Sequence, residues 1–142
     1  MAAFNKFYQF VEDLGLAVHN LSTGTLNIYL SNATPSASAD AVKTDLAEIT
    51  NQNGYTAPVD TQNTWAETSG TATLTGTAIT ITASGAVGPF NYVVLYNDTP
   101  TSPADPLIGW WVTDTEITLA NGETFTWKPN NSATTGTILT LA

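Results

Sequence analysis

Hydrophobic residues recur with two different periods along this chain, and the change of period divides it in two. In the first 21 residues they stand three or four positions apart, which places apolar side chains on one face of an α-helix. The pattern therefore predicts an amphipathic helix over about residues 4–20, ended by Ser22 and Gly24. The apolar stripe comprises Phe4, Phe7, Phe10, Val11, Leu14, Ala17, Val18 and Leu21, with Tyr8 at its border.

Two shorter elements are predicted to follow this helix. Residues 25–30 alternate between polar and apolar side chains, which predicts a strand with Leu26, Ile28 and Leu30 facing the core. Residues 40–49 place Val42, Leu46 and Ile49 on one helical face, behind Ser38 or Asp40 as N-cap. This spacing predicts a short second helix near 40–49.

From Trp65 onward, short alternating segments are separated by turn residues, which is typical of antiparallel β-structure. The predicted strands cover residues 71–74, 78–83, 92–96, 107–112, 115–119, 123–127 and 137–141, with Gly76 as a turn between the first two. Asn121–Gly122 predicts a type I′ hairpin that joins 115–119 to 123–127.

The fold class expected from these elements is mainly β. We expect one domain over residues 1–142, an antiparallel β-sandwich of jelly-roll-like form with an N-terminal amphipathic helix and one short second helix. Residues 1–22 would hold the N-terminal helix, and residues 25–142 the sandwich with its short helix near 40–49.

The segment Tyr92–Tyr96 is apolar at every position, so both faces of that strand are expected to be covered. The N-terminal helix is the first candidate for the cover, and a neighbouring subunit is the second. Trp110 and Trp111 are consecutive on a predicted strand and must point to opposite faces. One of them should lie in the core and the other under a helix or in a contact with a partner.

Composition narrows the possible partners. The chain has three basic and twelve acidic residues among 142, a formal net charge of -9, and no cysteine. Such a charge repels phosphate backbones and anionic membrane surfaces, so neither nucleic acid nor a membrane is an expected partner. No secretory leader is recognisable, and the longest apolar runs are too short to cross a bilayer.

Residues that carry catalytic or metal chemistry are few. His19 is the only histidine, and its position predicts a surface or helix-end residue; with one histidine and no cysteine, zinc is not expected. Glu116 and Glu123 share the predicted hairpin, but its register does not place them opposite each other, which disfavours a glycosidase pair.

Two further kinds of site are disfavoured. Asp98, Asp105 and Asp114 offer oxygen ligands for calcium, but their spacing lacks the alternation of an EF-hand loop, and we interpret them as turn residues. Gly85 and Gly88 precede a strand rather than opening a helix, so they form no phosphate-binding loop. We expect no enzyme, no cofactor and no bound metal.

Several motifs together resemble a family of small structural proteins encoded by tailed bacteriophages. The resemblance rests on FNKFYQFVEDLGLAVHNLSTGTLNIYLSNATP, EITNQNGYTA, GPFNYVVLYNDTPTSPADPLIGWW and LANGETFTW, in this order over nearly the whole chain. It implies a virion protein, with decoration or cementing of the head as its role, and it carries no catalytic residues. The implied partner is the major capsid protein, with self-association as a homotrimer.

The resemblance also implies a place in the virion, on the outer surface of the capsid, for a protein made in the cytoplasm of the bacterial host. The alternative is a protein of the tail or of a host-binding appendage, whose exposed tyrosines and tryptophans contact glycans. The residues expected at an interface are Phe4, Phe7, Tyr8, Phe10, Val11, Leu14, Trp110 and Trp111.

Overall fold

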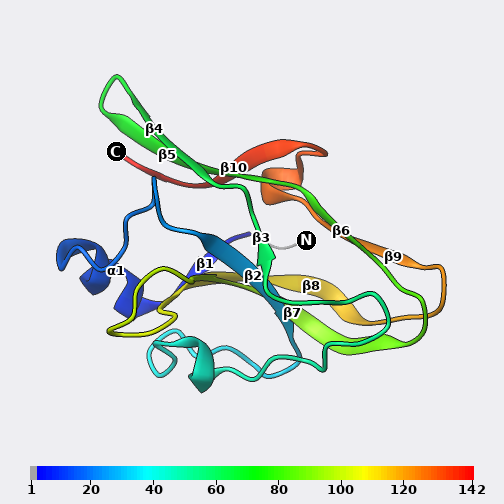
Figure 1. The fold of residues 1–142 in the computed structure, drawn as a ribbon. Coiled ribbons are helices and arrows are strands. Elements are labelled where there is room, and N and C mark those ends of the chain that lie inside the picture. The colour runs from blue at the N-terminus through cyan, green and yellow to red at the C-terminus, as the bar shows by residue number, and fades with distance from the viewer. Residues whose placement is uncertain (1–2) are drawn as a thin grey trace.

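The computed structural model describes residues 3–142, which form a mainly β fold of antiparallel sheets with one α-helix (Figure 1). The elements are β1 (Asn5–Lys6), α1 (Tyr8–Gly15), β2 (Leu26–Ser31), η1 (Lys43–Asp45), β3 (Val59–Asp60), β4 (Thr64–Thr68), β5 (Thr71–Thr77), β6 (Ile79–Thr82), β7 (Val87–Asn97), β8 (Leu107–Leu119), β9 (Thr124–Trp127), η2 (Pro129–Asn131) and β10 (Thr135–Leu141). Short 3-10 turns are written η.

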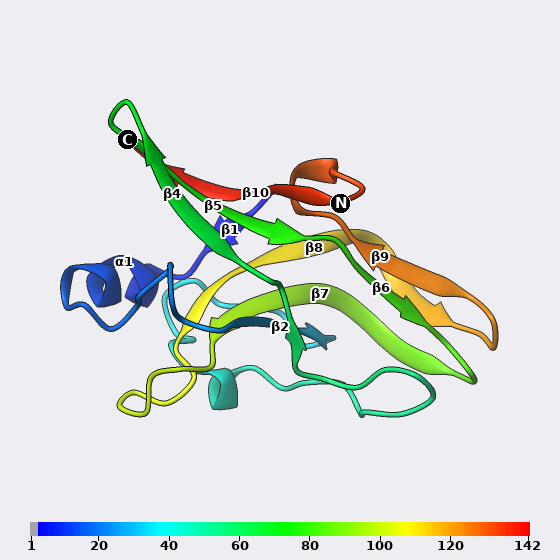
Figure 2. The ribbon, with the colours of Figure 1, turned by 45° about the horizontal axis from the view of Figure 1, so that its top comes forward.

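Within the described residues the strands form three sheets, with the orders β1-β8-β7-β2-β3, β10-β5-β4 and β6-β9. Figure 2 shows the β10-β5-β4 sheet lying over the five-stranded sheet, with β6 and β9 extending to one side. The main core lies between them, because Leu74 of β5 and Ile138 of β10 belong to the same buried cluster as Val93 of β7 and Ile28 of β2. The mainly β expectation is therefore confirmed, and so is the inward face of β2.

The five-stranded sheet is covered on its other face as well. Val94 and Tyr96 of β7 form a second buried cluster with Tyr29 and with Phe7, which precedes α1. Leu46 completes this cluster from the long segment 32–58, which runs along the outer face of β2 and β7 (Figure 1). The expectation that both faces are covered is confirmed. The N-terminal helix was expected to cover this second face, but the segment 32–58 and Phe7 cover it instead.

The N-terminal helix is shorter than the periodicity predicts, eight residues instead of about seventeen. Residues before it are drawn into the sheet, because Asn5 and Lys6 pair with Trp110 and Gly109. The helix ends at Gly15, and Ala17 takes a left-handed backbone with a φ of 58°. Of the apolar stripe only Phe7, Phe10 and Leu21 are buried, whereas Val11 and Ala17 are exposed. The stripe is divided between the residues around β1, the helix and the turn that follows it.

The predicted second helix is also wrong, since only the three-residue turn η1 forms within 40–49. The carboxylate of Asp45 accepts hydrogen bonds from the backbone of Ala41 and Val42, at 2.9 and 3.0 Å. The Lys43 amide donates to the carbonyl of Asp105, and that of Leu107 to the carbonyl of Ala41. These bonds to the 98–107 region take the groups that a helix would have paired internally.

The predicted hairpin at Asn121–Gly122 is wrong too, because β9 pairs with β6 and not with β8. Of the two turn residues only Gly122 has a positive φ, 85°, so the turn is not type I′. Its amide donates to the carbonyl of Ala83, just after β6, and this bond directs the chain into the other sheet.

Gly76, expected in a turn, lies inside β5 opposite Gly136 of β10. A Cβ atom there would lie 2.9 Å from the end of the Ile138 side chain, so a larger residue would require that side chain to shift. Close packing, rather than a change of chain direction, explains the residue.

Candidate interaction surface

The structure separates the eight expected interface residues by burial. Phe7, Phe10 and Trp111 are buried within the chain, which corrects the expectation that they are available to a partner. Phe4 and Leu14 pack against the main core and Trp110 against the second core, all partly buried. As expected, the two tryptophans lie on opposite faces, with Trp111 in the main core and Trp110 4.6 Å from the ring of Phe7. Tyr8 and Val11 remain exposed.

Helix α1 is held rigidly although no side chain caps its N-terminus. Phe7 and Phe10 anchor it in the two cores, and Gln9 donates to Asp13 one turn further along, at 2.9 Å. At its C-terminal end the amides of Ala17 and Val18 donate to the carbonyls of Leu14 and Asp13, which is the Schellman pattern. Phe7 and Phe10 thus fix this short helix to the body of the molecule, and the bonds of Ala17 and Val18 close its C-terminal end.

The solvent side of α1 carries exposed apolar side chains beside the charged Glu12. Tyr8 is 65% exposed, Val11 51% and Leu16, which follows the helix, 65%. Within residues 3–142 the other large hydrophobic residue with comparable exposure is Leu141, at 44%. A shallow hollow of about 310 Å³ beside the helix is lined by Leu14, Leu21, Trp65 and Leu141 among others. We call Tyr8, Val11 and Leu16 the α1 surface.

A buried polar group lies beneath this helix. Asn97, at the end of β7, has its Nδ2 3.3 Å from Nδ1 of His19, whose Nε2 lies 3.9 Å from Oδ2 of Asp13. Burial lowers the pKa of His19, and the charge of Asp13 acts in the opposite direction. The expectation of a surface or helix-end histidine is wrong, because the turn at Ala17 brings the ring inward against Phe10.

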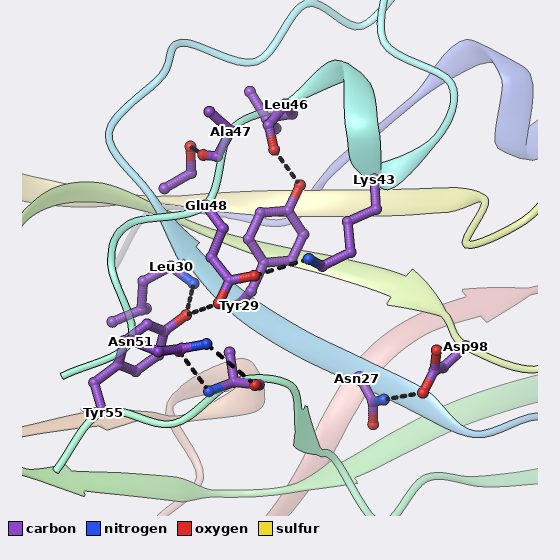
Figure 3. Close-up of polar contacts among 12 residues, drawn as sticks. Asn27, Tyr29, Leu30, Lys43, Leu46, Ala47, Glu48, Asn51, Tyr55 and Asp98 are labelled. Carbon is purple, nitrogen blue, oxygen red and sulfur yellow. Dashed lines mark hydrogen bonds and ion pairs between the residues drawn. The ribbon is translucent and has the colours of Figure 1, made fainter.

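The densest group of titratable side chains lies where the segment 32–58 crosses β2 (Figure 3). Lys43 Nζ lies 2.8 Å from Oε2 of Glu48 and 4.9 Å from the centre of the Tyr29 ring. Tyr55 donates its hydroxyl to Glu48 and accepts the amide of Leu30 at 2.8 Å, while Tyr29 donates to the carbonyl of Leu46. Each group has a partner inside the cluster, which thereby ties the segment to the sheet.

The tyrosines of this region are held in their neutral form. Burial raises the pKa values of Tyr29 and Tyr55, and the charge of Glu48 adds to the effect. For Tyr96 burial raises the pKa to about 12. A neutral phenol that is already hydrogen-bonded is suited to holding structure rather than to proton transfer at neutral pH.

The acidic residues weighed as calcium ligands lie in the loop after β7 and on β8. Asp98 accepts a hydrogen bond from Nδ2 of Asn27 at 3.0 Å (Figure 3). Burial and the neighbouring Asp98 raise the pKa of Asp105, while Lys43 opposes this shift. Among residues 3–142 no three His, Cys, Asp or Glu side chains gather as metal ligands.

Glu116 and Glu123 have separate partners. Asn32 donates to the carboxylate of Glu116 at 3.0 Å, and the amide of Ala120 donates to that of Glu123 at 2.7 Å. The latter bond closes the turn between β8 and β9.

Sequence reasoning missed Leu16 and the cluster around Tyr55. Leu16 lies outside the predicted apolar stripe of the helix. That position was the sequence signal that its side chain would be exposed. For the cluster no local pattern was available, since its members come from three separate segments.

Comparison of the chain with protein-family models, with curated proteins and with solved structures finds no match. The resemblance to bacteriophage structural proteins therefore stays a prediction. In the part of the chain that the structure describes, no helix has the length and apolar character required to span a membrane.

Proposed function

We propose that this chain is a non-enzymatic structural protein of a tailed-bacteriophage virion, a decoration or cement protein that binds and stabilises the outer head shell. The observation that carries the proposal is the α1 surface. Three of the four most exposed large hydrophobic residues within 3–142 lie between Tyr8 and Leu16. Single exposed hydrophobic residues are ordinary, but several gathered on one anchored helix are typical of an interface.

The way α1 is held supports this use. Because Phe7 and Phe10 fix the helix from below, its outer side chains lose little further freedom when a partner covers them. On a repeating shell many such contacts act together, so that each can be weak. The expected partner is the major capsid protein.

The negative net charge of the chain also supports the decoration role. A protein with a net charge of -9 repels its own kind over most of its surface, which keeps a densely covered particle soluble. A homotrimer is the proposed form, since it suits three-fold positions of a lattice. The protein would be made in the cytoplasm of the bacterial host and would reside on the outer capsid surface.

We also propose that the stacked sheets form a β-sandwich related to the jelly roll. The core shared by β2, β7, β5 and β10 supports two packed layers. The alternative role, a glycan-binding protein of the tail, has weaker support, because Trp111 and Trp127 are buried and Trp65 and Trp110 are half-buried. No broad aromatic platform is exposed among these four side chains.

The proposal can be tested with undecorated heads of the phage that encodes the chain. Purified protein should bind them saturably, and the variant Tyr8→Gln/Val11→Gln/Leu16→Gln should bind at least about tenfold more weakly. Glutamine keeps the helix propensity high while removing the apolar contact. Circular dichroism and thermal melting establish whether the variant is folded.

The matched control is Thr124→Gln, an exposed position on β9. Figure 1 shows β9 on the opposite side of the molecule from α1. This variant should bind as the unchanged protein does. A folded triple variant with unchanged affinity would remove the α1 surface from the proposal, and failure of the unchanged protein to bind heads would refute the decoration role.

A further inference from the structure

The exposed leucine near the end of β10, Leu141, lies on the core face of its sheet. It is paired with Ala72 of β5, two positions before Leu74, which is buried in the main core. Cross-strand partners share a face, and side chains two positions apart in a strand point to the same side, so Leu141 faces inward. It is nevertheless 44% exposed. The core face of the β10-β5-β4 sheet is therefore left open at this end.

This open end lies beside α1. Figure 2 shows the C-terminal end of β10 and the β4–β5 turn on the same side of the molecule as the helix. The hollow of about 310 Å³ lies here, because residues of the sheet and residues of the helix and its following turn line it together. We call it the Leu141 hollow, and its lining includes Leu14, Ala17, Leu21, Ser22, Trp65 and Leu141.

The Leu141 hollow has room for a large side chain. Its volume of about 310 Å³ is about twice the roughly 150 Å³ of an apolar protein cavity that binds benzene. Its walls are held in place, since Leu21 belongs to the main core and Leu14 and Trp65 pack against that core. A preformed apolar recess is where a single anchoring side chain contributes most to the affinity of an interface.

The hollow adjoins the α1 surface. Leu16 belongs to that surface and stands in the chain between Leu14 and Ala17, which both line the hollow. A partner that covers the α1 surface therefore also covers the open side of the hollow. The occupant is accordingly a side chain of that partner, and in naming the partner this inference rests on the proposed decoration role.

The charge near the hollow is negative. Within residues 3–142 none of the three lysines lines it. Glu67 lies two positions from Trp65 on β4 and shares its face. Like Leu141, Glu67 is paired with Ala72, and its carboxylate accepts a hydrogen bond from the amide of Gly70. An exposed carboxylate at this place, in a chain of net charge -9, favours a cationic group next to the inserted side chain.

We propose that the Leu141 hollow receives one large apolar side chain of the head-shell protein, from a segment in which a lysine or arginine is adjacent to that residue. The apolar side chain packs against Leu14, Trp65 and Leu141, and the cation pairs with Glu67. The shell is thus bound by a recess in the fold as well as by the outer side of α1.

The probe is the peptide Ac-Gly-Trp-Lys-Gly-NH2, titrated into the ¹⁵N-labelled full chain without heads and followed by amide chemical shifts. Saturable shifts are expected at Leu14, Leu21 and Leu141, which line the hollow. The same peptide with glutamate in place of lysine should bind about threefold more weakly or worse, because the exposed ion pair is replaced by repulsion. Absence of saturable shifts up to about 10 mM peptide, or equal affinities for the two peptides, would overturn the inference.

A variant that fills the hollow gives the second test. Leu141→Trp places a larger side chain in the recess and should weaken binding of the lysine peptide and of undecorated heads about tenfold or more. The matched control is Thr140→Trp, on the opposite face of the same strand, which should leave both affinities unchanged. Ser22→Trp fills the hollow from the turn after α1 and replaces Leu141→Trp if the spectrum of that variant lacks the dispersion of a folded chain.

The inference and the decoration role fail in different ways. An added tryptophan on a flat apolar surface would strengthen the contact, so a folded filling variant that binds heads as tightly as the unchanged protein overturns the inference and leaves the decoration role standing. Failure of the unchanged protein to bind heads refutes the decoration role, and the peptide titration then still decides whether the hollow takes such a segment.

Discussion

At the scale of single residues, the hydroxyl of Tyr55 makes two contacts that the fold cannot easily replace. It accepts a hydrogen bond from the backbone amide of Leu30 and donates one to the carboxylate of Glu48. In Tyr55→Phe the Leu30 amide would stay buried without a partner, so the free energy of unfolding should fall by about 1–3 kcal/mol. Urea denaturation measures the change.

Tyr92→Phe is the control for this prediction. The Tyr92 hydroxyl is 3.4 Å from Thr34 at an exposed position, and its loss should change the free energy of unfolding by less than about 0.5 kcal/mol. Equal effects of the two variants would show that the Tyr55 contacts do not hold the segment 32–58.

His19 gives the fold a pH dependence. Its pKa is lowered by burial in the folded state, so the folded chain binds the proton less readily than the unfolded chain does. The contribution of His19 is therefore complete above its unfolded pKa, about 6.5, and is lost as the pH falls from there towards the lower folded pKa. Denaturation experiments between about pH 7.5 and 5.5 should show that the free energy of unfolding decreases as the pH decreases.

His19→Gln cannot take up this proton, and its stability should fall less over the same interval. Each protein serves as its own reference at the higher pH, so a general loss of packing does not affect the comparison. Parallel pH curves for the two proteins would contradict a buried neutral imidazole.

At the scale of elements, the turn after β8 decides whether β9 belongs to β8 or to β6. Asn121 has no positive φ, and Glu123 donates its amide to the carbonyl of Ala120 at 3.0 Å, so proline is compatible with position 121. Asn121→Pro should change the free energy of unfolding by less than about 1 kcal/mol. Thermal and urea denaturation test this.

A type I′ hairpin would respond differently, because proline cannot adopt the positive φ that this turn needs. A loss well above 1 kcal/mol in Asn121→Pro would thus favour the hairpin over the observed sheet change. Gly122→Ala is the companion variant and should destabilise the fold, since its φ of 85° suits glycine.

Local patterns predicted several of the strands, although they divided the single strand β8 into two, and they predicted the strand partners poorly. The alternation in residues 25–30 corresponds to β2, and the final strand corresponds to β10, because burial on one face leaves a period of two in the sequence. The pairing of β9 with β6 depends on bonds to Ala83, which is distant in sequence. A local turn motif contains no information about this competition between β6 and β8 for pairing with β9.

The helices were also mispredicted because tertiary contacts override the local pattern. Phe4 and Phe7 fit a helical stripe, yet one packs on Trp111 and the other on Trp110, and the helix begins only after them, at Tyr8. Of the candidate surface, Tyr8 and Val11 were predicted and Leu16 was not. Spacing identifies apolar residues, but tertiary packing decides which of them stay exposed.

At the scale of the whole molecule, the chain covers its own sheet. The apolar run Tyr92–Tyr96 predicted a cover, and the segment 32–58 provides it through Leu46 and the Tyr55 cluster. A neighbouring subunit is therefore not needed for that face. The exposed apolar area that remains is concentrated near α1, and it is this area that we assign to contacts within the virion.

The account depends most on α1 being the side that meets the head shell. Hydrogen–deuterium exchange of the free and head-bound protein tests this directly, because both states are compared at every amide. We expect binding to slow exchange in residues 8–18, whose amides lie in and after α1, and to leave residues 120–127 unchanged. Slowed exchange around the β8–β9 turn, with α1 exchanging as in the free protein, would contradict the account.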